Sequence, residues 1–230
     1  MSARKLVIFD CDGTLVDSQN AIVAAMDAAF EGVGLRPPSR AQTLSIVGLS
    51  LPEAFAVLAP DQTVAVTAEL VRLYKGVFPA KRSAAELKSP LFPGTREIIA
   101  DLAQRDDVVL GIATGKSRRG VVRLLDQEGW HDHFLTIQTA DDHPSKPHPS
   151  MVLRAMGETG AGPGETVMVG DTTYDMEMGR AAGAGAIGVA WGYHPAPRLT
   201  AAGAQTVITA FADLPAAIAR LLARAEPLGS

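Results

Sequence analysis

Short runs of apolar residues recur along the chain, and each ends abruptly in small or polar residues. Three of these runs cover residues 6–9 (LVIF), 108–113 (VVLGIA) and 166–169 (TVMV). Continuous apolar runs of this length, rich in β-branched residues, indicate parallel strands that are covered on both faces. Because such segments alternate with helical ones from residue 93 to residue 189, we predict an α/β fold with a doubly wound, mainly parallel, Rossmann-like sheet.

A helical region separates the first run from the others. Apolar residues recur there at helical spacing in three segments: residues 18–34, 51–58 and 63–78. We therefore predict a small α-helical domain over residues 17–88, inserted into an α/β core made of residues 1–16 and 89–230. A final amphipathic helix is predicted over residues 214–223.

Composition limits the classes of function. A chain of 230 residues with 47% hydrophobic content can bury one sizeable core and a smaller second unit. The formal net charge of −4 is not typical of nucleic-acid binding, so no nucleic-acid partner is expected. A single cysteine, Cys11, excludes an internal disulfide. No apolar segment of membrane-spanning length follows a basic start, so we expect a cytoplasmic protein without membrane contact.

Carboxylates follow two of the apolar runs directly. Asp10 and Asp12 come after residues 6–9, and Asp171 and Asp175 come after residues 166–169. Open α/β sheets bind their ligands at the carboxyl ends of the strands, so chemistry is expected at these positions. A single Asp-Gly pair such as Asp12-Gly13 would by itself indicate an ordinary turn. Oxygen ligands gathered in this way suit Mg²⁺.

Two further segments offer groups that bind an anion. Thr114 and Gly115 follow residues 108–113, where a hydroxyl and free backbone N–H groups at a helix start suit a phosphate group. Lys146 lies in the segment 145–149 (SKPHP), whose prolines restrict the backbone, so its ammonium can be held rather than solvated. Each group alone also has an ordinary structural interpretation, as a helix cap or a surface lysine.

These segments form the ordered set Asp-x-Asp-Gly-Thr, Thr-Gly, Lys-Pro and Gly-Asp-x-x-x-Asp. With this set the chain resembles the haloacid dehalogenase superfamily over nearly its full length, and most closely its phosphoglycolate phosphatase branch. The resemblance implies a magnesium-dependent phosphatase that works through an aspartyl-phosphate intermediate. It also implies a helical cap domain and a small phosphorylated metabolite, such as 2-phosphoglycolate, as substrate.

The resemblance assigns roles to the four aspartates. Asp10 matches the nucleophile, and Asp12 matches the general acid and base for the leaving group and for water. Asp10, the backbone carbonyl of Asp12 and Asp171 match the ligands of Mg²⁺. Asp175, one helical turn after Asp171, lies outside the ligand set and is close enough to orient the waters bound to the metal.

The resemblance also assigns the phosphate-binding groups. Thr114 and the Gly115 amide match donors to the phosphate, and Lys146 matches the cation that offsets the charge of Asp10 and the phosphoryl group. Substrate choice in this family depends on a loop of the cap domain. The best candidate for that loop here contains Val47, Gly48 and Leu49.

Two other functions remain open. Sugar-phosphate mutases of the same family carry a lysine and an arginine in the cap loop, where this chain has Val47 and Leu51, which weighs against a mutase. A noncatalytic binding module would keep the fold without turning over a phosphoester. The chain does not identify the physiological substrate, and it is compatible with a monomer or a homodimer.

Overall fold

The computed structural model describes residues 4–80 and 89–223. Its strands are β1 (Lys5–Phe9), β2 (Val108–Thr114), β3 (Phe134–Thr139), β4 (Thr166–Gly170), β5 (Gly185–Val189) and β6 (Thr206–Ile208). Its α-helices are α1 (Gln19–Gly32), α2 (Arg40–Ser45), α3 (Leu51–Leu58), α4 (Val64–Ala80), α5 (Thr95–Ala103), α6 (Arg118–Glu128), α7 (Ser150–Thr159), α8 (Thr173–Ala181), α9 (Ala196–Ala201) and α10 (Leu214–Ala223).

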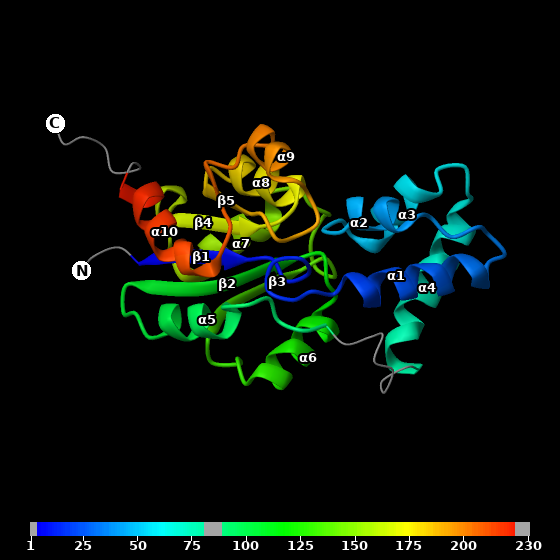
Figure 1. The fold of residues 1–230 in the computed structure, drawn as a ribbon, viewed down its shortest axis with the longest axis horizontal. Helices are drawn as coiled ribbons and strands as arrows, with labels where there is room; N and C mark the ends of the chain where they lie inside the picture. The colour runs from blue at the N-terminus through cyan, green and yellow to red at the C-terminus, as the bar shows by residue number, and fades with distance from the viewer. Residues whose placement is uncertain (1–3, 81–88, 224–230) are drawn as a thin grey trace.

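The six strands form one parallel sheet with the order β3-β2-β1-β4-β5-β6 (Figure 1). Strand β1 lies inside the sheet, with Val7 paired to Leu110 of β2 on one side and to Val167 of β4 on the other. The order of the strands reverses between β1 and β4, which makes this the switch point at which doubly wound sheets bind ligands. The predicted fold class is therefore confirmed.

The apolar run of β1 is continuous because both faces of the sheet are covered. Alternate side chains of a strand point to opposite faces. Leu6 and Ile8 accordingly pack in the cluster that includes residues of α7 and α8, whereas Val7 and Phe9 pack in the cluster that includes residues of α5, α6 and α10. All four side chains are fully buried. Burial on both faces removes the polar positions that a one-sided strand would show.

Helices α1 to α4 pack on one another and lie beyond one end of the sheet (Figure 1). Phe55 of α3 is fully buried among them, with its ring centroid 6.0 Å from that of Phe30 and 6.2 Å from that of Tyr74. The sequence pattern predicted three of these helices and missed α2. That helix has six residues, too few for a periodic pattern, and it begins with a capping box between Ser39 and Gln42.

The helical unit contacts the carboxyl end of the sheet through backbone groups. The carbonyl oxygen of Ser45, which ends α2, accepts hydrogen bonds from Tyr174 Oη at 3.3 Å and from His194 Nε2 at 3.1 Å. His194 Nδ1 accepts from the backbone N–H of Thr173, so the proton lies on Nε2. The backbone N–H of Ser50 donates to Ser145 Oγ at 2.8 Å.

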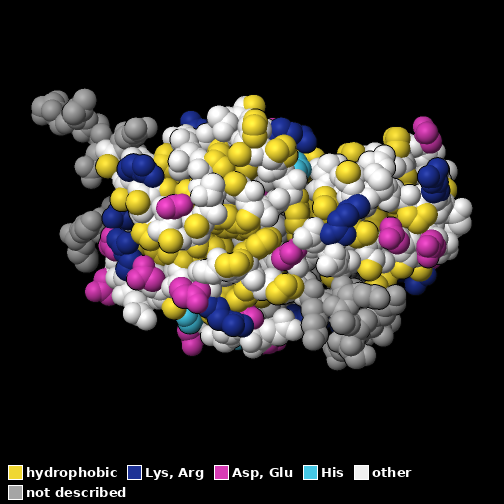
Figure 2. All heavy atoms as spheres, in the orientation of Figure 1, with side chains coloured by type: hydrophobic (Ala, Val, Ile, Leu, Met, Phe, Trp, Pro, Cys, Tyr) yellow, Lys and Arg dark blue, Asp and Glu magenta, His cyan; other side chains and the backbone are white. Residues whose placement is uncertain are grey.

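The surface carries both signs of charge. On the face shown in Figure 2, Lys and Arg side chains lie among Asp and Glu side chains and do not gather into a basic patch. Within residues 4–80 and 89–223, no helix has both the length and the apolar character that crossing a bilayer requires.

Candidate active site

All four sequence motifs meet at the carboxyl ends of β1, β2 and β4. Asp10 directly follows β1, Thr114 is the last residue of β2, and Asp171 directly follows β4. Because these strands are neighbours in the sheet, residues more than a hundred positions apart in the chain lie side by side. Lys146 reaches the same place from the loop before α7, whose helix starts only after Pro149, as the two prolines predicted.

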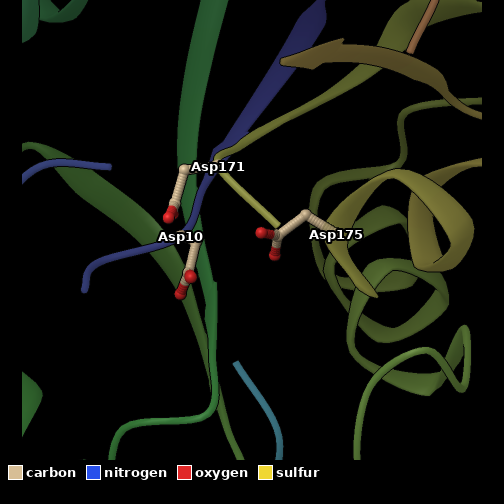
Figure 3. Close-up of side chains that lie close together, drawn as sticks. All are labelled: Asp10, Asp171 and Asp175. Carbon is tan, nitrogen blue, oxygen red and sulfur yellow. The ribbon is translucent and has the colours of Figure 1, made fainter. Parts of the chain in front are cut away.

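Three buried carboxylates converge there. Figure 3 shows Asp10 at the end of β1 and Asp171 at the end of β4 close together, with Asp175 from the first turn of α8 pointing toward them. One oxygen from each lies within 4.8 Å of those of the other two. All three residues are at most 1% exposed. Three anions so close together in a dry site repel one another unless cations stand between them.

Lys146 supplies one such cation. Its ammonium lies 2.6 Å from Asp175 Oδ1 and 3.1 Å from Asp10 Oδ1, and its side chain is fully enclosed. Burial by itself would lower the pKa of this lysine, but the two carboxylates raise it above its usual value. Lys146 is therefore charged and fixed in place, as the sequence predicted.

Asp175 is held by the start of α8. The side chain and backbone of Thr172 form a capping box with Asp175, whose Oδ2 accepts from the Thr172 hydroxyl at 2.7 Å and from its backbone N–H at 3.0 Å. Its other oxygen faces Lys146. Asp175 therefore holds the Lys146 ammonium beside the neighbouring carboxylates.

Asp171 lies in a cradle of glycines and donors. Its Oδ1 accepts from the Thr14 hydroxyl at 2.8 Å, and its Oδ2 accepts from the backbone N–H of Tyr193 at 2.9 Å. A Cβ atom added at Gly13 or at Gly192 would overlap with the Asp171 side chain. Gly13 also has a φ of +87°, which other residues rarely adopt. Because neither glycine has a side chain, both leave room for the carboxylate of Asp171.

The electrostatics of the carboxylates fit a divalent cation. Burial raises the pKa of Asp10 to about 6, despite the opposing effect of Lys146 and with a further rise from Asp175. Burial and the charges of Asp175 and Asp10 also raise the pKa of Asp171 well above its usual range. The Lys146 ammonium and the Thr114 hydroxyl both oppose this rise in the pKa of Asp10 without cancelling it. A hard cation with oxygen ligands would favour the charged forms of both carboxylates.

Asp12 is less enclosed than these three carboxylates. Its carboxylate is half-buried, and Oδ1 lies 2.6 Å from the ammonium of Lys116. The backbone N–H of Lys116 in turn donates to Thr114 Oγ1 at 3.2 Å. Asp12 and Asp10 thus present their carboxylates in two different environments, one accessible and one dry, as two distinct chemical roles require.

The loop with Val47, Gly48 and Leu49 lies directly on the Thr114-Gly115 segment. A Cβ atom at Gly115 would lie 2.6 Å from the carbonyl oxygen of Gly48 and 2.9 Å from that of Leu49. The backbone of this loop, which has a φ of +103° at Gly48, therefore comes closest to the core. The side chain of Leu49 packs against the apolar cluster of α1 to α4 instead.

Four residues at the site were not assigned a role from the sequence: Thr14, Lys116, Gly192 and Tyr193. Thr14 belongs to the Asp-x-Asp-Gly-Thr motif, so its position there was an available signal. The remaining three lie next to their partners only because of the fold.

Known proteins with similar sequences match this chain over most of their length. The family model of haloacid dehalogenase-like hydrolases matches residues 7–189. "Probable phosphatase IndB" of Dickeya dadantii is 39% identical over 95% of this chain and 95% of its own. Pyrophosphatase PpaX of Bacillus pumilus is 31% identical, over 83% of this chain and 85% of its own. Phosphoglycolate phosphatase of Yersinia pestis is 30% identical over 92% of both chains.

Solved structures agree with the sequence comparison. A haloacid dehalogenase-like family hydrolase from Streptococcus pneumoniae superposes with a TM-score of 0.80, covering 94% of this chain and 99% of that one at 23% identity. That likeness concerns the fold, and the family match rests on the sequence. By its sequence, this chain belongs to the haloacid dehalogenase-like hydrolase family.

Proposed function

We propose that this protein is a magnesium-dependent phosphatase that hydrolyses a small phosphomonoester through an aspartyl-phosphate intermediate. The observation that carries the proposal is the placement of Asp10, which is 1% exposed at the end of β1 and lies 3.1 Å from the enclosed ammonium of Lys146. A buried carboxylate has little hydration to lose before it attacks, and the adjacent cation offsets its charge toward an incoming phosphate.

The chemistry divides between Asp10 and Asp12. In the first step, an oxygen of Asp10 forms a bond to phosphorus as the bond to the leaving oxygen breaks, and Asp12 gives its proton to that oxygen. In the second step, Asp12 takes a proton from water, which attacks phosphorus and releases Asp10 and phosphate. Thr114 and the Gly115 amide would donate to the phosphoryl oxygens, and Lys146 would offset their charge.

Mg²⁺ would be held by Asp10, the backbone carbonyl of Asp12 and Asp171. When bound, it would neutralise the charge that gathers on the phosphoryl group. Thr14, Tyr193 and the glycine cradle hold Asp171 in place for this role, and Asp175 holds Lys146. The donor set consists of oxygens alone, which suits a hard cation.

We assign the cap role to α1 to α4. The loop at Gly48 rests on the proposed phosphate-binding segment, so it would exclude bulk water while the aspartyl phosphate exists. Its close approach favours a small leaving group such as glycolate. A cytoplasmic location and a monomeric or homodimeric state remain predictions.

Release of inorganic phosphate tests the proposal. We would assay 2-phosphoglycolate, hexose phosphates, nucleoside monophosphates and pyrophosphate with Mg²⁺ and with chelator, and use Asp10→Asn to detect a contaminating phosphatase. We expect release that depends on Mg²⁺, stops with chelator, returns when Mg²⁺ is restored and is absent from the variant. Absence of release from every compound would contradict the proposal and favour a noncatalytic module. Transfer of phosphate within a hexose phosphate, without release, would favour a mutase.

A further inference from the structure

Lys116 is a second cation at the site, and the chemistry above does not use it. It follows the Thr114-Gly115 segment, and the middle of its side chain lies over Gly120 of α6. A Cβ atom added at Gly120 would lie 2.8 Å from Cγ and 3.2 Å from both Cδ and Cε of Lys116. The absence of a side chain at Gly120 therefore leaves room for Lys116 to fold back toward Asp12 instead of extending into solvent.

The ammonium of Lys116 lies 2.6 Å from Asp12 Oδ1, and both groups remain accessible. The Lys116 side chain is 24% exposed and that of Asp12 is 13% exposed, whereas Lys146 is fully enclosed. Burial lowers the pKa of Lys116, but Asp12, Cys11 and Asp10 together raise it above its usual value, so the group is charged at neutral pH. Lys146 is committed to Asp10 and Asp175, while Lys116 can exchange its partner for a ligand.

The position of Asp12 defines what Lys116 can reach. Asp12 must contact the oxygen of the leaving group if it delivers the proton, so the atoms bonded to that oxygen lie within reach of the Lys116 ammonium. The helical unit also comes close here, because a Cβ atom at Gly115, the residue before Lys116, would lie 2.6 Å from the carbonyl oxygen of Gly48. A partly desolvated ammonium beside the leaving group favours an anion and gains little from a neutral group.

Other cations that could meet such an anion are less well placed. Arg40 donates to Gln19 and Asn20 at an exposed position. Lys75 of α4 is 54% exposed and lies 3.9 Å from Asp141. Lys81 and Arg82 lie outside the described residues. Lys116 is therefore better placed for this role than Arg40 or Lys75.

We propose that Lys116 selects substrates whose leaving group carries an anionic oxygen group, a carboxylate or a second phosphoryl group, next to the ester oxygen. This inference rests on the proposed function, since it assigns the leaving group to the side of Asp12. An anionic leaving group would draw the ammonium away from Asp12 Oδ1 and free that oxygen for the proton transfer. A neutral leaving group would leave the ion pair with Asp12 in place.

Paired substrates test this proposal. Ethyl phosphate has the skeleton of 2-phosphoglycolate with a methyl group in place of the carboxylate, so the ratio of their kcat/KM values measures recognition of the anion. We expect Lys116→Met to lower the preference for 2-phosphoglycolate roughly 10- to 100-fold, mainly through KM, as loss of a charged hydrogen bond predicts. Lys116→Arg should retain most of the preference. The matched control Lys75→Met removes a neighbouring cap cation and should leave the ratio as it is.

Pyrophosphate shows which anionic group Lys116 recognises, a carboxylate or a second phosphoryl group. A fall in the relative kcat/KM for pyrophosphate, with no change in the ratio for 2-phosphoglycolate, would identify the second phosphoryl group as the anion. An equal fall for all three compounds in Lys116→Met would overturn the proposal, because Lys116 would then only position Asp12. A wild-type enzyme without preference for either anionic compound would overturn it as well.

Binding separates this proposal from the proposed function. In the Asp10→Asn background, calorimetric titration with 2-phosphoglycolate and Mg²⁺ gives an affinity that requires no turnover. Tighter binding of 2-phosphoglycolate than of ethyl phosphate, lost on adding Lys116→Met, would support anion recognition even if phosphate release failed. Equal binding of the two compounds would contradict it.

Discussion

Replacing Asp10 by asparagine should stabilise the metal-free protein while abolishing phosphate release. Burial raises the pKa of Asp10 from 3.8 to about 6, so the fold favours its protonated form. Because the pKa of Asp10 is higher in the folded state than in the unfolded state, its protonated form stabilises the fold. This contribution to the free energy of unfolding is fully present below pH 3.8 and is lost as the pH rises through 6. Because each pKa unit corresponds to 1.36 kcal/mol, the charged carboxylate costs about 3 kcal/mol above pH 6. Asparagine has nearly the same shape and carries no charge.

Thermal unfolding in chelator measures this effect. A domain of this size gains about 2–4 °C in Tm per kcal/mol, so Asp10→Asn should unfold roughly 6–12 °C above wild type at pH 7.5. The difference should shrink as the pH falls from 6 toward 4, where Asp10 is protonated. Mg²⁺ should raise the Tm of wild type at pH 7.5 and raise that of the variant less. Asp101→Asn, at an exposed position on α5, is the matched control and should change the Tm little.

A variant that is less stable than wild type in chelator at pH 7.5 would refute this reasoning. The same holds for a gain that does not depend on pH, since it would show that charge on Asp10 is not its cause. Retained phosphate release in Asp10→Asn, above that of a mock purification, would refute the assignment of the nucleophile.

Three further results are expected. Lys146→Met leaves two buried carboxylates without their cation and should destabilise the protein by about 3–5 kcal/mol at pH 7.5, measured by denaturant unfolding. Lys146→Arg, which keeps the charge, is the comparison. A Lys146→Met variant as stable as wild type would contradict the role of this cation. Gly192→Ala would push a Cβ atom into Asp171 and should lower kcat/KM roughly 100-fold at fixed Mg²⁺. Gly76→Ala, with open space in α4, should leave activity intact, and equal losses in the two variants would argue against the cradle. Phe55→Ala opens a cavity among α1 to α4 and should cost about 3–5 kcal/mol, whereas a cost below about 1 kcal/mol would contradict tight packing there.

Much of the local structure follows from short-range patterns. The run at residues 6–9 is a strand in the structure, residues 51–58 and 214–223 are helices with the predicted bounds, and Ser150 begins α7 directly after the second proline. Such patterns depend on the spacing of apolar residues and on residues that restrict the backbone, and both act within a few positions of the chain. The sequence pattern did not predict the short helix α2, because it has too few turns for apolar residues to recur at helical spacing.

The sequence by itself determined the candidate site residues, because three of the four motifs lie where an apolar strand ends and chain reversal must follow. It did not determine which charges meet. Lys146 stands between Asp10 and Asp175 because β1 and β4 are neighbours in the sheet, and no local pattern encodes that neighbourhood. The tertiary structure likewise decided that Gly192 and Tyr193, after β5, complete the cradle of Asp171, and that Lys116 meets Asp12. These contacts join distant segments, and their energies depend on burial, which exists only once the sheet has formed.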